Sequence, residues 1–92
     1  MAERVTVGGV EAPCDASKLA DIRFVLMLGD LDDGTLPDSE KLATMARLTR
    51  YLFGAERDSV VDALAEANGG ALPAEEFSRW LADYLSEVGA KN

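Results

Sequence analysis

Histidine is absent from the sequence, and cysteine occurs once, as Cys14. Without histidine, the chain cannot form a Ser–His or Cys–His nucleophile pair, nor a zinc site of cysteine and histidine ligands. A single cysteine cannot form a disulfide within the chain, and its use is compatible with the cytosol. No other group of residues has the pattern of a catalytic site. We therefore expect a protein that is not an enzyme and that needs no cofactor and no metal.

Basic residues and long apolar runs are also scarce. Nine Lys and Arg stand against 17 Asp and Glu, which gives a formal net charge of −8. The basic residues do not form the patch that nucleic-acid binding needs, and an acidic surface disfavours anionic membranes. No run approaches the ~20 apolar residues of a membrane span, and the first residues lack the apolar core of a signal peptide. We therefore expect a cytoplasmic protein that binds neither nucleic acid nor membranes.

What the chain does contain is enough apolar material for one small globular domain. It has 92 residues, 48% of them hydrophobic, which is normal for a folded domain and argues against disorder. We expect a mainly α fold, a compact four-helix domain over residues 1–92. A short N-terminal β-hairpin is expected at residues 4–14 and the helical core at residues 17–89.

The hairpin is predicted from polarity that alternates with period two on both sides of Gly8-Gly9. Two glycines suit a two-residue turn, which would place Val7 opposite Val10 with their apolar side chains on one side. Proline donates no backbone hydrogen bond, so Pro13 is expected to end the second strand.

Helix starts and stops are marked by proline, acidic residues and glycine. They predict helices from Ser17 or Asp21 to Leu31, from Pro37 to Gly54, from about Glu56 to Asn68, and from Pro73 to Gly89. The second and fourth helices each carry an apolar stripe at helical spacing. The stripes comprise Leu42, Met45, Ala46, Leu48, Thr49, Leu52 and Phe53 in the second helix, and Phe77, Trp80, Leu81, Tyr84 and Val88 in the fourth.

The first long helix is apolar nearly all round, and the rest of the chain must be organised around it. At about 100° per residue, one face holds Phe24, Met27, Leu28 and Leu31, and the other holds Ile22, Val25 and Leu26. The second face either packs against the chain's other helices or is kept for a partner. Because it exceeds what three short neighbouring helices need, we predict a homo-oligomer in which this helix contributes to the contact.

Trp80 and Tyr84 are further candidates for protein binding. Aromatic residues at this spacing are more often core, but both can bury a ring and keep a polar tip in water, as residues at the rim of an interface do. The candidate protein-binding residues are thus Ile22, Val25, Leu26, Trp80 and Tyr84.

Two motifs give a partial match to known sites. Residues 30–40 resemble a calcium loop, but aligning Gly34 and Glu40 with such a loop places Gly29 and Leu31 where oxygen donors are required. We therefore expect an acidic helix–helix turn there. Asp58-Ser59-Val60 resembles the Asp-Ser-Leu motif of acyl carrier proteins, which carry phosphopantetheine on the serine. A carrier with its arm on Ser59 is thus one alternative, and an unrelated helical protein-interaction module is another.

Over most of its length the chain resembles the short tail assembly chaperones of long-tailed phages and prophages. The similarity is in the order and kind of the segments rather than in one motif. It covers the glycine-turn hairpin Val5–Ala12, Asp21-Ile22-Arg23-Phe24 leading to Asp32-Asp33-Gly34, a Leu-Pro start and Tyr51-Leu52-Phe53-Gly54 end for the second helix, Asn68-Gly69-Gly70, and Leu72-Pro73 before Glu76 and Phe77.

This resemblance implies a non-enzymatic, all-helical binding protein in the cytoplasm of the infected host. Members of the family keep the long, apolar, helical tape measure protein soluble until tail-tube subunits, the major tail protein, assemble around it. They also tend to self-associate. An acidic chain with a surplus apolar helix face is physically suited to cover an apolar helix of another protein.

Overall fold

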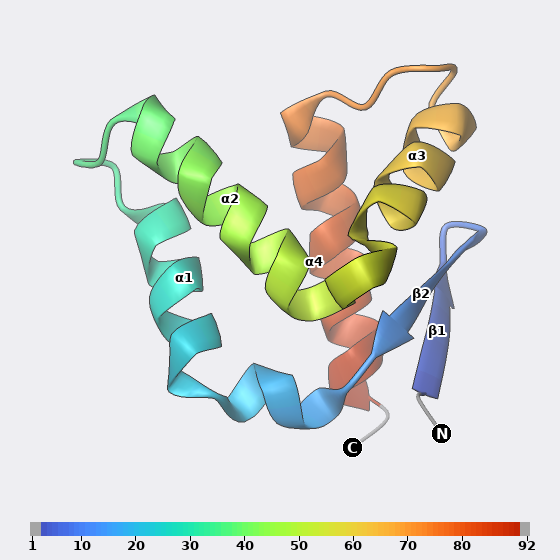
Figure 1. Cartoon of the computed structure of the whole chain (residues 1–92), viewed down its shortest axis with the longest axis horizontal. Helices are drawn as coiled ribbons and strands as arrows, with labels where there is room; N and C mark the ends of the chain where they lie inside the picture. Colours follow the sequence, from blue (N-terminus) through green and yellow to red (C-terminus); the bar gives the residue numbers. More distant parts are fainter. Residues whose placement is uncertain (1–2, 91–92) are drawn as a thin grey trace.

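The structure is a computed structural model that describes residues 3–90 (Figure 1). It confirms the mainly α fold, in which four α-helices follow an N-terminal β-hairpin. The elements are β1 (Glu3–Val7), β2 (Val10–Cys14), the 3-10 helix η1 (Ala16–Ala20), α1 (Ile22–Asp32), α2 (Asp38–Phe53), the 3-10 helix η2 (Gly54–Glu56), α3 (Arg57–Ala67) and α4 (Ala74–Ala90). The last helix continues through Gly89, where we expected it to end.

The hairpin forms in the predicted register, with Val7 opposite Val10. Gly8 and Gly9 both have positive φ, 58° and 81°, as a two-residue type I′ turn requires. The prediction for Pro13 was wrong, because Pro13 lies inside β2. Hydrogen-bonded and non-hydrogen-bonded pairs alternate along antiparallel strands, so Pro13 falls in a non-hydrogen-bonded pair. The missing N–H of Pro13 therefore removes no hydrogen bond between the two strands.

The core lies between the hairpin and the helices. β1 lies against α4, whereas β2 contacts α2 and α3. In Figure 1 the hairpin and α1 lie on opposite sides of the molecule, with the other helices between them. The core includes valines of both strands and the largest apolar side chains of all four helices, among them Val5, Val10, Phe24, Leu48, Phe53, Leu64, Phe77 and Val88. The hairpin, which would be marginal alone, is thus stabilised by the apolar face it shares with α4.

Trp80 and Tyr84 fasten the hairpin to α4 and are both buried, at 8% and 1% exposure. The indole Nε1 of Trp80 donates to the Val7 carbonyl at 2.8 Å, and the Tyr84 hydroxyl donates to the Pro13 carbonyl at 2.7 Å. Their rings stack at a centroid distance of 5.3 Å. Each polar tip finds its partner inside the molecule, so these two residues belong to the core. The core position, which is the more frequent one for aromatic residues at this spacing, is therefore the one they occupy, and the alternative position at an interface rim is not.

The predicted apolar stripe of α2 is present but only partly buried. Thr49 and Phe53, in the C-terminal half of the helix, are buried. Leu42 and Ala46 continue the same line toward the N-terminus and are exposed, Leu42 at 67%. The same face of one helix is therefore covered at one end and open at the other.

Candidate protein-interaction surface

The outer face of α1 carries the first exposed apolar surface. Ile22, Val25 and Leu26 are 64%, 50% and 61% exposed, and we call these residues the α1 ridge. On the opposite face Phe24 is buried, and Met27, Leu28 and Leu31 pack against the core as partly buried side chains. The predicted division of this helix into two faces is confirmed. Of the two alternatives for the second face, packing by the chain's other helices is not what the structure shows.

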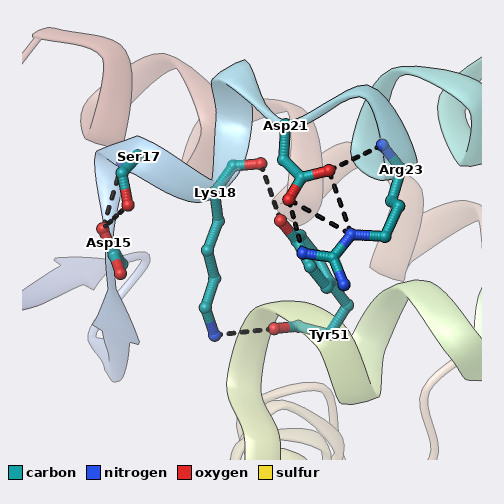
Figure 2. A network of polar contacts seen from close by, with 6 residues as sticks. All are labelled: Asp15, Ser17, Lys18, Asp21, Arg23 and Tyr51. Carbon is teal, nitrogen blue, oxygen red and sulfur yellow. Dashed lines mark hydrogen bonds and ion pairs between the residues drawn. The ribbon is translucent and has the colours of Figure 1, made fainter.

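A polar network holds the start of α1 against the C-terminal end of α2 (Figure 2). The Lys18 ammonium donates to the Tyr51 carbonyl at 2.8 Å, and the Tyr51 hydroxyl donates back to the Lys18 carbonyl at 3.1 Å. Lys18 and Arg23 both lie over the Tyr51 ring, 5.4 and 5.6 Å from its centroid. Cations at this distance from a ring face are attracted to it. The network therefore fixes the segment on which the α1 ridge begins.

Asp21 is the N-cap of α1 and the acidic centre of that network. Its carboxylate accepts from the Arg23 backbone N–H at 2.8 Å and from the Arg23 guanidinium at 2.6 Å. The Arg23 side-chain hydrogen bond, with the backbone bond second, holds the pKa of Asp21 well below its usual range. An ionised carboxylate at a helix N-terminus is also favoured by the helix dipole. The α1 ridge thus lies on a helix with a firmly capped start.

The second exposed apolar surface is a groove between the N-terminal halves of α2 and α4, which start at the same end of the molecule (Figure 1). Two adjoining hollows, of about 390 and 450 Å³, share Leu42 and Met45 in their walls. We call the pair the α2–α4 groove. Its other apolar walls include Leu31, Val61, Leu72, Phe77 and Leu81, and charged side chains at its edges include Asp38, Lys41, Arg57 and Asp58.

The sequence analysis missed this groove and the part that Leu42 plays in it. Leu42, Ala46, Thr49 and Phe53 lie on one line of α2, and only the last two have a neighbour that covers them. Helical periodicity gives the direction in which a side chain points but does not show whether another element lies there. The only signal available was the width of the α2 stripe, which is large for a helix with few neighbours.

Both remaining motifs border the α2–α4 groove, because Leu31 and Asp38 of residues 30–40 and Asp58 of the Asp58-Ser59-Val60 motif line it. Within the described part of the chain, no three His, Cys, Asp or Glu side chains are grouped so that they could hold a metal ion. Ser59 and Asp58 lie exposed in the first turn of α3. Among the helices of residues 3–90, none has both the length and the apolar character to cross a membrane.

We compared the chain with protein-family models, with curated proteins and with solved structures, and nothing matched in any of the three comparisons.

Proposed function

We propose that this protein is a tail assembly chaperone of a phage or prophage. In that role it binds an apolar helix of the tape measure protein in the host cytoplasm and keeps it soluble until the major tail protein assembles around it. The chain catalyses no reaction in this role. The resemblance of its segments supports the assignment, and the α1 ridge is the structural observation that carries it.

The ridge supports this function because its exposed apolar side chains would contribute free energy if another protein covered them, and a monomer leaves that free energy unused. Full burial of one large aliphatic side chain contributes about 1.5–3 kcal/mol. Ile22, Val25 and Leu26 leave half or more of their surface in water. An apolar helix in a groove or against a ridge is a common mode of recognition. The same surface is suited to self-association, so we propose that the free chaperone is a homo-oligomer.

Co-expression with the tape measure protein encoded beside this chain tests the proposal. We expect the soluble yield of the tape measure protein to rise several-fold with the wild-type chain and to stay at the basal level with Leu26→Asp. Ala82→Asp is the matched control, because Ala82 is exposed on α4 outside both apolar surfaces. A tape measure protein that stays insoluble with the wild-type chain would contradict the assignment.

An acyl-carrier-like function is the second candidate, favoured by the exposure of Ser59 in the first turn of α3. A transferase could reach this hydroxyl without opening the fold. Incubation with coenzyme A and a phosphopantetheinyl transferase tests it. A gain in mass located on Ser59 would replace the chaperone proposal, whereas an unchanged mass removes the carrier. If neither this experiment nor co-expression gives a positive result, a helical interaction module of another role remains.

A further inference from the structure

We infer that the α1 ridge of one copy of this chain docks into the α2–α4 groove of a second copy, so that copies associate head to tail. The inference extends the self-association proposed above by assigning its two surfaces. It depends on this chain alone and not on the identity of the tape measure protein.

The first argument is that one contact covers both exposed apolar surfaces. The ridge is convex and aliphatic, and the groove is concave with Leu42 and Met45 between its two hollows. None of the ridge residues lines either hollow, so one copy can offer its ridge and its groove at the same time. A symmetric pairing of two α1 ridges would instead leave Leu42, 67% exposed, and the groove in water.

The second argument is charge. Among the four α-helices, α2 is the one in which basic residues outnumber acidic ones, because Lys41, Arg47 and Arg50 stand against Asp38 and Glu40. The last turn of α1 and its C-cap are acidic, with Asp30, Asp32 and Asp33. Lys41 and Arg57 lie in the walls of the groove. Asp38 and Asp58 lie in the same walls, so the groove carries no net charge on an otherwise acidic surface. The acidic end of α1 therefore meets less repulsion at the groove than elsewhere on the surface, which favours this orientation.

The third argument is area. The chain exposes 5776 Å², whereas a monomer of this mass is expected to expose about 5,200 Å². The excess, about 600 Å², is smaller than the ~800 Å² that each partner contributes to a standard-size interface and fits a contact at the small end of the range. The radius of gyration, 13.0 Å, is likewise larger than the ~12.3 Å expected for a chain of this length. The molecule is thus more open than a chain that completes its own core.

A contact between two different surfaces has a consequence that a symmetric contact lacks. Each copy that docks its ridge still has a free groove, so association continues until a ring closes or the chain of copies ends. An apolar helix of another protein that binds the α1 ridge would compete with the groove of the neighbouring copy for that ridge. Self-association would therefore keep the apolar surfaces covered while no such helix is present.

Two single variants and their mixture test the inference by analytical ultracentrifugation. Leu26→Asp removes the ridge and keeps the groove, and Leu42→Asp removes the groove and keeps the ridge. We expect wild type to form species larger than a dimer and each variant alone to be monomeric. An equimolar mixture should form a one-to-one dimer and stop there, because the intact ridge of one variant fills the intact groove of the other.

Control measurements distinguish a loss of assembly from unfolding and from a general effect of added charge. Ala82→Asp introduces the same charge on an exposed part of α4 and should assemble as wild type does. Both tested leucines are more than 60% exposed, so the variants should keep the wild-type circular dichroism and Trp80 fluorescence. A monomeric wild type, self-association of Leu42→Asp alone, or a mixture that stays monomeric would each overturn the inference. None of these results depends on tape measure binding, so the proposed function is tested separately.

Discussion

The indole N–H of Trp80 and the hydroxyl of Tyr84 attach the hairpin to α4. Trp80 and Tyr84 each donate to a backbone carbonyl of the hairpin, and those bonds come from residues more than 70 positions away in sequence. Burial, as the largest cause, raises the pKa of Tyr84 above its usual range, so the hydroxyl stays protonated and remains a donor. In residues 3–90 every buried side-chain polar atom has a hydrogen-bond partner. Loss of either bond would leave a buried polar group unpaired, which lowers the free energy of unfolding.

Tyr84→Phe should lower the free energy of unfolding by about 1–2 kcal/mol, because it leaves the Pro13 carbonyl without its donor while the ring still packs. Urea unfolding followed by circular dichroism measures the change. Tyr84 lines neither hollow of the α2–α4 groove and is not part of the α1 ridge, so self-association should be unchanged in this variant. A stability equal to wild type would show that the hydroxyl has another partner of equal strength.

The stability of the α1 segment should fall in acid. Folding lowers the pKa of Asp21 from its ordinary value of 3.8, chiefly through the Arg23 side chain. Above that value the carboxylate is ionised in both states, and its bonds contribute fully. As the pH falls below 3.8, the unfolded chain takes up a proton more readily than the folded one, so stability is lost until the folded carboxyl is also protonated.

Chemical unfolding of wild type and Asp21→Asn at a series of pH values checks this expectation. The variant should be less stable at neutral pH and should lose less stability than wild type as the pH falls through 3.8. The pKa values of Asp15, Asp33 and Glu56 are also lowered in the fold, so some acid dependence remains in the variant. Parallel pH profiles for the two proteins would contradict the role given to Asp21.

Among the elements, α1 has one buried and one exposed apolar face; its sequence predicted the two faces but left open whether the second one is covered by other helices. The spacing of Phe24 and Leu28 gave the inner face, and that of Ile22 and Leu26 gave the outer one. These elements were predictable because periodicity, caps and glycine turns are local signals. Which side chains of α2 are buried was harder to predict, because the exposure of Leu42 depends on where α3 and α4 lie. Contacts between distant segments, such as Trp80 with Val7, left no local signal at all.

The two faces of α1 should respond differently to truncation. Phe24→Ala removes a buried ring and should cost about 3–5 kcal/mol, which is a large part of the stability of a domain of this size. Leu26→Ala removes an exposed side chain, and surface substitutions usually stay within about 0.5 kcal/mol. Urea unfolding at a concentration low enough to keep wild type monomeric measures both. Equal losses would show that the outer face is packed within the monomer.

The whole molecule combines an acidic surface with two uncovered apolar surfaces. It measures 36 × 32 × 22 Å, a flattened shape that places a large share of each helix near the surface. A net charge of −8 keeps complexes dispersed but does not recognise the shape of a helix. In the proposed function, affinity for a partner therefore comes from the exposed apolar surfaces. Helical periodicity predicted a surplus apolar face on α1, whereas the groove depends on how α2, α3 and α4 lie relative to one another.

The most direct measurement is the affinity of the chain for a purified apolar helical segment of the cognate tape measure protein, by titration calorimetry. We expect Leu26→Asp to weaken binding at least tenfold and Ala82→Asp to leave it unchanged. Binding should persist from about 0.1 M to about 1 M salt, over which the range of electrostatic interactions falls from ~10 Å to ~3 Å. Equal affinities for wild type and Leu26→Asp, or binding that disappears at high salt, would contradict recognition through the exposed apolar surfaces.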